Sequence, residues 1–145
     1  MLSGGEGNPY EPLNLTANYV ALMNLQVPTI GICLGHEIVA SAYQAKIKRL
    51  PDYHGKKERV IVTVPDVPIF AGLEKREIMM QKKHHFHVPD PSRHFDILAY
   101  SEVCPNEIMR HREKPIYGFQ GHPEVSGEEG MRIMGNFLRM CGFEN

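Results

Sequence analysis

The spacing of hydrophobic and polar residues along the chain predicts an α/β sheet. An apolar run over 27–30 leads into a Gly-x-Cys-x-Gly turn, and an alanine-rich helical pattern over 38–45 follows it. Before this run, apolar residues recur at helical spacing from an N-cap at Asn14 or Thr16 to about Asn24. Helix, buried strand and helix in this order are typical of α/β sheets, in which ligands bind at the carboxyl ends of strands.

Further strands and a closing helix are predicted along the rest of the chain. Polar, turn-rich residues at 51–58 come first. β-Branched or alternating apolar runs then predict strands at 59–64, 77–81, 95–101, 107–111 and 116–120. From about Gly127, a helix is predicted to pack on the sheet through a stripe of Met131, Met134, Leu138 and Cys141. The sequence shows no repeat, low-complexity segment or linker, which favours a single domain over 1–145.

Composition narrows the class of protein. With 42% hydrophobic and 23% charged residues, the chain has the balance of one globular domain. Its net charge is -1, so no basic excess favours binding to nucleic acid or to an anionic membrane. No apolar run approaches the ~20 residues of a transmembrane helix, and no signal-peptide pattern opens the chain. The 3 widely spaced cysteines argue against a disulfide framework, and we expect a cytoplasmic protein.

Cys33 lies at the centre of the predicted strand, turn and helix. Gly31 and Gly35 flank it at the two positions where a nucleophile elbow needs glycine, because the tight turn leaves no room for a Cβ there. The turn presents the thiol at a helix N-terminus, where the macrodipole favours the reactive thiolate. The same pattern also fits a small buried cysteine at a strand end. From this stretch alone, both interpretations stay open.

His122 and Glu124 form a second candidate pair, after the strand predicted at 116–120. Pro123 between them favours an extended backbone, in which side chains two residues apart leave on the same face. The carboxylate would then hold the imidazole in one tautomer. A thiol, a histidine that accepts its proton and an acid that orients the histidine make a complete nucleophile arrangement. Together with Cys33, the pair favours catalysis, whereas His122 alone is equally typical of a structural histidine.

Two further segments have an unusual composition. Gly4, Gly5 and Gly7 fit a loop whose backbone N–H groups hold an anion, although composition alone favours a flexible terminus. At 82–87, three histidines in four positions raise the question of a metal site. Adjacent residues of an extended segment point to opposite faces, and no cysteine or carboxylate pattern accompanies these histidines. We therefore expect a solvated loop here and no metal site.

Three ordered segments resemble the signature motifs of the class I (triad-type) glutamine amidotransferases. They are Leu2-Ser3-Gly4-Gly5, Gly31-Ile32-Cys33-Leu34-Gly35-His36 and Tyr117-Gly118-Phe119-Gln120-Gly121-His122-Pro123-Glu124. Within this family, the stretches 97–101, 114–118 and 136–142 are most similar to the amidotransferase subunit of GMP synthases. The resemblance covers essentially the whole chain, and the motifs occur in the family's order.

The resemblance implies a flavodoxin-like open α/β sheet and a glutaminase. Cys33 would attack the side-chain amide of glutamine, His122 would carry the thiol proton to the departing ammonia, and Glu124 would orient His122. A γ-glutamyl thioester would then be hydrolysed to glutamate. These roles come from the family to which the motifs are similar, and they agree with the chemistry of the three side chains.

The resemblance also implies the substrate-binding groups and a partner. Backbone N–H groups of Gly4, Gly5 and Leu34 would hold the oxyanion, and Glu37 and His84 would lie at the substrate. No cofactor is expected in this domain. The ammonia would pass to an ATP-dependent synthetase (ATP pyrophosphatase) subunit or domain, which uses ATP and Mg²⁺ to convert XMP to GMP.

The chain departs from the family pattern at four places. The family's first strand, helix and strand are missing, so we expect a partial domain, truncated at the N-terminus and with an open apolar edge. Glu37 replaces a glutamine, and its charge is expected to make ionisation of Cys33 more costly. Lys83 and Phe86 replace the serine and aspartate of a Ser-His-x-Asp segment. Gly121 replaces a bulky aromatic residue, and we expect looser packing behind the neighbouring histidine.

Three functions stay open on this evidence. The chain is an active glutaminase with a variant pocket, a cysteine hydrolase of another amide, or a paralogue that only binds a partner. Because nucleophile, base and acid are all kept, glutamine hydrolysis ranks first.

Overall fold

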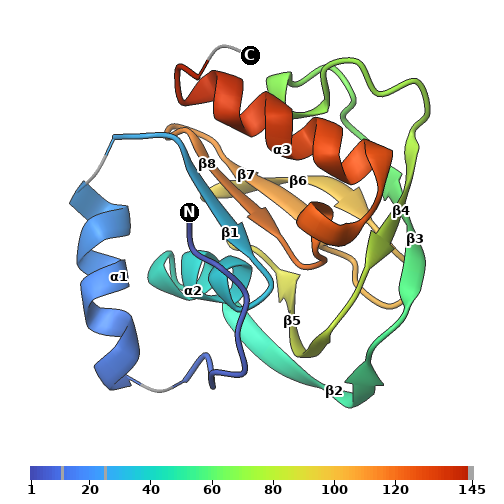
Figure 1. Cartoon of the computed structure of the whole chain (residues 1–145). Coiled ribbons are helices and arrows are strands. Elements are labelled where there is room, and N and C mark those ends of the chain that lie inside the picture. The colour runs from blue at the N-terminus through green and yellow to red at the C-terminus, as the bar shows by residue number, and fades with distance from the viewer. Residues whose placement is uncertain (11, 25, 144–145) are drawn as a thin grey trace.

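The chain folds as an open β-sheet with helices on both of its faces (Figure 1). The computed structural model describes residues 1–10, 12–24 and 26–143. In this part of the chain the helices are α1 (Pro12–Asn24), α2 (Leu34–Ala42) and α3 (Glu128–Met140), with short 3-10 turns η1 (Pro68–Phe70) and η2 (Pro123–Val125). The strands are β1 (Thr29–Ile32), β2 (Lys46–His54), β3 (Lys57–Val62), β4 (Glu77–Gln81), β5 (His84–Asp90), β6 (Phe95–Tyr100), β7 (Ile108–His111) and β8 (Ile116–Phe119).

Six of the described strands form the main sheet, in the order β1-β8-β7-β6-β3-β4, and β2 pairs with β5 in a separate two-stranded sheet. β1 and β8 are parallel, and the other paired strands of the main sheet are antiparallel. On the other side of β1, Leu2 forms a parallel bridge with Gly31. The Leu2 N–H donates to the Ile30 carbonyl over 2.8 Å, and the Leu2 carbonyl accepts from Ile32 over 2.9 Å. The predicted open α/β sheet is confirmed, and Leu2 extends it beyond β1.

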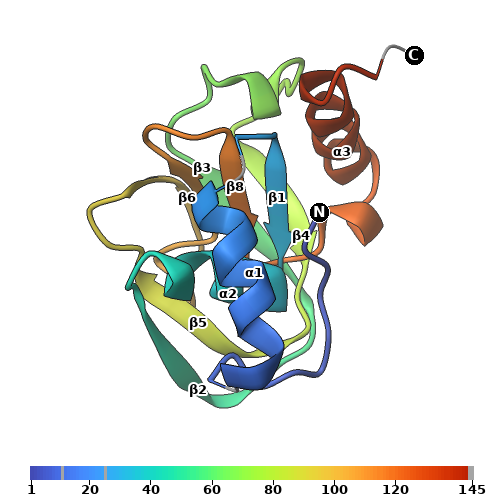
Figure 2. The same ribbon diagram turned by 90° about the vertical axis from the view of Figure 1, so that its left-hand side faces the viewer.

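Apolar side chains cover both faces of the main sheet. α3 lies across one face, where Ile133 and Phe137 pack in a core that includes Ile30 of β1. α2 lies against the opposite face, and α1 packs on α2 (Figure 2). Val39 of α2 and Leu22 of α1 belong to this second core. Of the helices described, none combines the length and the apolar character needed to cross a membrane.

The strands predicted from apolar runs are confirmed, and β4 has the predicted bounds. Two polar stretches were predicted wrongly. The stretch 51–58 was expected to be turn-rich, but 51–54 belong to β2 and 57–58 to β3. The stretch 82–87 was expected to be a solvated loop, but 84–87 belong to β5. β2 and β5 pair with register shifts after Lys46 and Arg49, so neither strand shows a regular two-residue alternation. Both strands also pack on α2, which directly precedes β2 but lies far from β5 in the sequence.

Two helices differ in detail from the prediction. α1 begins at Pro12, earlier than either predicted N-cap, and proline suits a first helical turn because its missing N–H would have no partner there. α3 buries Ile133 and Phe137; of the predicted stripe, Met134 and Cys141 pack against the core, whereas Met131 and Leu138 are exposed. A Cβ on Gly130 would collide with the Pro123 carbonyl, so this glycine lets α3 approach η2 closely and sets which face is buried. Leu15 is one of the apolar residues on which the prediction of α1 depends, and its side chain lies outside the described part of the structure.

Candidate active site

Cys33 occupies a sharp turn between β1 and α2. Its backbone has φ 53° and ψ -110°, a conformation that costs energy for a residue with a side chain. A Cβ on Gly31 would collide with the Gly35 carbonyl, and a Cβ on Gly35 would collide with the Leu2 carbonyl. The two glycines are therefore required by close backbone approach, as the elbow pattern predicts. A strained cysteine at a strand-to-helix turn, with such a glycine on each side, has the geometry of a nucleophile elbow.

The Cys33 thiol is buried, with 4% of the residue exposed. Its Sγ donates a 3.4 Å hydrogen bond to the Lys83 carbonyl. Burial, and then the charge of Glu37, raise the pKa of Cys33 to about 12. The expectation that the helix N-terminus makes Cys33 a thiolate is therefore wrong, because desolvation outweighs the helix dipole. The expected effect of Glu37 on the thiol is confirmed.

His122 and Glu124 form the predicted pair, but on the 3-10 turn η2 and not on the extended backbone that was expected. His122 Nδ1 lies 2.7 Å from Glu124 Oε1, so Nδ1 carries the proton that the carboxylate accepts. Nε2 is then free to act as a base, and it has no hydrogen-bond partner among the described residues. The His122 backbone N–H donates to the Gln81 carbonyl over 2.8 Å, and Ser126 Oγ donates to the His122 carbonyl. These contacts hold the histidine at the start of η2.

Gly4 brings the two halves of the site together. A Cβ built on Gly4 would lie 2.8 Å from His122 Cε1 and 3.3 Å from Cys33 Cβ. The nucleophile and the base are thus neighbours across the glycine loop, which composition alone would have left as a flexible terminus. They line one pocket of about 890 Å³. Six predicted residues line this pocket: Gly5, Cys33, Leu34, Glu37, His84 and His122.

A family model agrees with this geometry. The model of the class-I glutamine amidotransferases matches residues 1–141. This chain belongs to the class I glutamine amidotransferases. The fold and family expected from the sequence motifs are confirmed.

Individual proteins that are similar to this chain have names that are more specific than the name of the family. The chain is 40% identical over 121 residues to one subunit of the glutamine-hydrolyzing GMP synthase of Methanococcus aeolicus, covering 83% of this chain and 63% of that protein. The subunit of the same name from Pyrococcus abyssi is 40% identical over 80% of this chain and 61% of its own length. The chain thus spans less than two thirds of the length of these curated relatives.

Solved structures show the same fold. The crystal structure of a candidate GMP synthase subunit from Thermoplasma acidophilum superposes with a TM-score of 0.88 at 30% identity, covering 97% of this chain and 71% of that one. A glutamine amidotransferase from Thermotoga maritima, at 20% identity, has a TM-score of 0.74 over 94% of this chain and 58% of its own. The second likeness concerns the fold alone.

Glu37 of this amidotransferase lies in the wall of the pocket and is 3% exposed. Its Oε1 accepts a 3.1 Å hydrogen bond from Gln120 Nε2. Burial raises the pKa of the Glu37 carboxyl to about 7, and the bond from Gln120 opposes this rise. Around neutral pH the side chain therefore exchanges between a carboxylate and a neutral acid that donates a hydrogen bond.

His84 lines the pocket from the start of β5, which corrects the solvated-loop prediction. It is 3% exposed, and its ring stacks on His54 at a centroid distance of 5.4 Å. Nδ1 donates to the Phe86 carbonyl over 2.7 Å, and burial lowers the pKa of His84 to about 4. The imidazole is therefore neutral at physiological pH. No group of three metal-binding side chains occurs in the described part of the chain.

Gly121 does not loosen the packing behind His122, so that expectation is wrong. A Cβ on Gly121 would collide with the side chain of Met80, which is 1% exposed. The Met80 thioether also accepts a 3.3 Å hydrogen bond from Ser126. The methionine thus fills the space beside Gly121, and flexible methionine is well suited to such filling.

Sequence reasoning missed the segment that joins β4 to β5. Gln81 and Lys83 present backbone carbonyls to His122 and to Cys33, and Lys82 between them is fully buried. Every residue has a backbone carbonyl whatever its side chain, so contacts of this kind cannot be predicted from the pattern of side chains. A lysine next to a second lysine indicates a solvated position, since lysine is rarely buried. No local signal in the sequence could have shown this role.

Proposed function

We propose that the chain hydrolyses the side-chain amide of glutamine. The observation that carries this proposal is the arrangement around Gly4, with Cys33 on one side and the His122 ring, bonded to Glu124, on the other. A strained thiol beside a free imidazole nitrogen is suited to acyl transfer. Membership of the class I glutamine amidotransferases supports glutamine as the substrate.

In the proposed reaction, His122 Nε2 removes the proton from Cys33 Sγ as the sulfur attacks the amide carbon. The carbon–nitrogen bond breaks, and the proton passes from Nε2 to the nitrogen, which leaves as ammonia. Water, deprotonated by the same Nε2, then attacks the γ-glutamyl thioester. The carbon–sulfur bond breaks, glutamate leaves and the proton returns to the thiolate.

Two features of the site support this sequence of steps. Backbone N–H groups of Leu34 and of the Gly4-Gly5 loop lie beside the nucleophile and are our candidates for the oxyanion hole, where each donor commonly contributes ~3 kcal/mol. The raised pKa of Cys33 means that the resting thiol is neutral. We therefore propose that proton transfer to His122 accompanies attack.

We further propose that the ammonia passes to an ATP-dependent synthetase that converts XMP to GMP. The relatives named as subunits of GMP synthase support this acceptor. Because each of them is one subunit of its enzyme, they also support a separate synthetase chain or domain. ATP and Mg²⁺ would be used by that partner and not by this chain.

A glutamine-mimicking chloroketone tests the hydrolysis. We expect it to add one mass increment at Cys33, detected by peptide mass spectrometry. Cys33→Ala removes the adduct, whereas the matched variant Cys141→Ala, at a partly buried thiol on the far end of α3, retains it. Absence of an adduct in the presence of the synthetase would refute the proposal.

One observation favours a second candidate function. Glu37 adds negative charge beside the nucleophile and raises its pKa. This arrangement suits a site that has lost glutaminase activity and binds a partner, or one that hydrolyses another amide. A partner-binding module would bind the synthetase with equal affinity in wild type and Cys33→Ala and would release no glutamate.

A further inference from the structure

Lys82 lies inside the protein, directly behind the proposed active site. The residue has no exposed surface, and its Nζ forms an ion pair with Glu107, whose side chain is 1% exposed. Among the described residues Nζ has no other hydrogen-bond partner. A buried ion pair usually gives little stability, because desolvation of the two charges offsets their attraction. Its presence therefore needs another explanation.

The backbone on both sides of Lys82 contacts the catalytic residues. The preceding Gln81 carbonyl accepts the His122 N–H over 2.8 Å, and the following Lys83 carbonyl accepts the Cys33 thiol over 3.4 Å. The Lys82 N–H itself donates to the Lys56 carbonyl over 3.0 Å. Gln81, Lys82 and Lys83 are consecutive, so this one segment contacts the base, the interior of the protein and the nucleophile.

Glu107, at the other end of the ion pair, is fixed and also reaches the site. Its Oε1 accepts a 2.6 Å hydrogen bond from Ser101, and its N–H donates to the Ala99 carbonyl over 2.9 Å. The Glu107 carbonyl accepts the Gln120 N–H over 2.8 Å, and Gln120 is the residue that bonds Glu37. The ion pair therefore connects the segment behind Cys33 to the strand end that precedes His122.

We propose that Lys82 is a positioning residue, which holds the Gln81–Lys83 segment against Cys33 and His122 through its ion pair with Glu107. The proposal rests on the proposed hydrolysis, because positioning matters only where the two side chains react. Lys82 touches no reacting atom. It acts by keeping two backbone carbonyls at fixed places on either side of the nucleophile and base.

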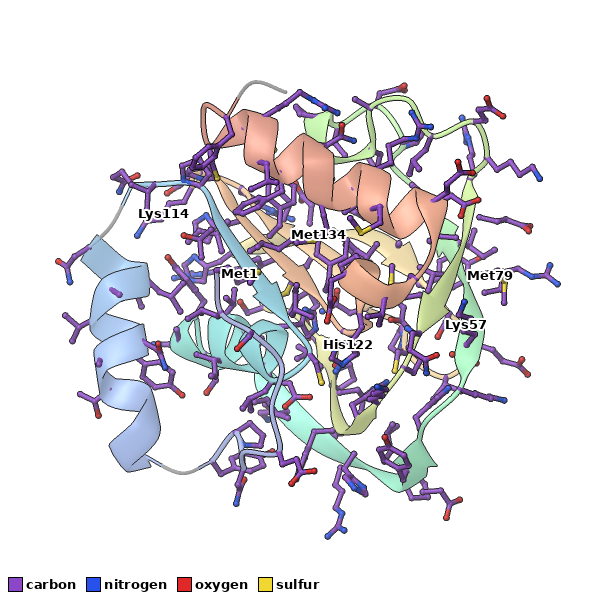
Figure 3. The ribbon with its side chains drawn as sticks, in the orientation of Figure 1. Met1, Lys57, Met79, Lys114, His122 and Met134 are labelled. Carbon is purple, nitrogen blue, oxygen red and sulfur yellow. The ribbon has the colours of Figure 1, made fainter. Side chains whose placement is uncertain are left out.

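The test uses a double variant, Lys82→Met with Glu107→Gln, since either change alone leaves an unpaired buried charge that unfolds many proteins. The double variant removes both charges at nearly constant volume, and the amide oxygen of the new glutamine can still accept from Ser101. The matched control is Lys57→Met, which makes the same substitution at an exposed lysine of β3 (Figure 3). If the double variant does not fold, Ser101→Ala, which removes the bond that fixes Glu107, gives the same readouts with a smaller expected effect.

Two measurements are made on each variant, after its melting curve has shown that the protein is folded. Hydrogen exchange by NMR at the His122 and Gln120 amides reports positioning without any chemistry, and we expect faster exchange in the double variant. The maximal rate of Cys33 alkylation by the glutamine-mimicking chloroketone is expected to fall at least about tenfold, with an unchanged half-saturating concentration. Lys57→Met should match wild type in both.

The outcomes separate this inference from the proposed function. If the folded double variant keeps wild-type alkylation, Lys82 is not a positioning residue, whatever the exchange result. If wild type itself is not alkylated but exchange at His122 and Gln120 rises only in the double variant, glutamine hydrolysis fails and the positioning of His122 stands. Unchanged exchange overturns the inference in either case.

Discussion

Gln120 Nε2 donates a 3.1 Å hydrogen bond to Glu37 Oε1 in the pocket wall beside Cys33. An amide at position 37 would accept the same hydrogen bond through its oxygen without carrying a charge. Replacing the carboxylate by an amide here would remove the charge that, after burial, raises the pKa of the Cys33 thiol most.

Glu37→Gln is expected to make Cys33 more reactive above about pH 7, the pKa to which burial raises the Glu37 carboxyl. Above this pH the wild-type carboxylate raises the pKa of the thiol, and the variant lacks that charge. Below it, Glu37 is protonated and the two proteins should react alike. The measurement is the rate of iodoacetamide alkylation at Cys33 against pH. The exposed variant Glu128→Gln serves as control, and an equal gain at every pH would contradict a charge effect.

Glu124→Gln is expected to lower kcat for glutamine hydrolysis at least about tenfold, with KM nearly unchanged. The amide oxygen of the variant can still accept the proton of His122 Nδ1, which in wild type lies 2.7 Å from Glu124 Oε1, but it does not stabilise the imidazolium that forms during attack. Steady-state release of glutamate measures the effect. Glu129→Gln, exposed in the first turn of α3, should behave as wild type. An unchanged kcat in Glu124→Gln would remove the carboxylate from the catalytic arrangement.

Gly4→Ala is expected to abolish Cys33 alkylation by the glutamine-mimicking chloroketone while the protein stays folded. The added Cβ would lie 2.8 Å from His122 Cε1 and 3.3 Å from Cys33 Cβ, so it would push the two side chains apart. Mass spectrometry and a melting curve test both halves of the expectation. Gly135→Ala, whose Cβ would find its nearest neighbour at 3.8 Å, is the control. Normal alkylation in Gly4→Ala would show that the loop is not part of the site.

Buried neutral histidines are expected to make the fold sensitive to acid. Burial lowers the pKa of His84 from the usual 6.5 to about 4 and that of His36 to about 3. The unfolded chain takes up these protons below about pH 6.5 and the folded chain does not, so the free energy of unfolding falls as pH drops from 6.5 towards 4. Glu37 acts in the opposite sense, because its raised pKa lowers stability as pH rises from 4.5 to about 7.

The size of the histidine contribution is measured by urea unfolding at several pH values. His84→Gln should show a shallower loss of stability between pH 6.5 and 4 than wild type. His85→Gln, at the exposed neighbouring position, keeps the buried imidazole and should follow the wild-type slope. Equal slopes in both variants would mean that His84 does not control acid stability.

Local patterns were sufficient for the parts of the molecule in which neighbouring residues determine the structure. The elbow follows from glycines at 31 and 35, since backbone crowding acts over a few residues. The pairing of His122 with Glu124 was predicted from their closeness along the chain, although they meet at a short 3-10 turn and not on extended backbone. The strands with continuous apolar runs were also predictable, because burial on both faces leaves a strong signal.

Local sequence patterns gave wrong predictions where segments that are far apart in the sequence determine which residues are buried. The stretch 82–87 is polar in composition, but pairing with β2 and packing on α2 bury His84, and Lys82 is buried beside it. α3 buries Ile133 and Phe137, and its close approach to η2 at Gly130 turns Met131 and Leu138 of the predicted stripe towards solvent. In the sequence, Gly121 predicts loose packing. In the structure, the side chain of Met80, from another strand, fills the space beside it.

The sequence by itself determined the family, through three short motifs in the family's order, and the elbow with Cys33 and the pair of His122 and Glu124, because each motif consists of residues that are close along the chain. Only the tertiary structure decided that the thiol is neutral, that Glu37 is poised near pH 7 and that a buried Lys82 stands behind the site. The physical reason is desolvation, since the cost of a charge depends on everything that surrounds it in space, and no local pattern records those surroundings.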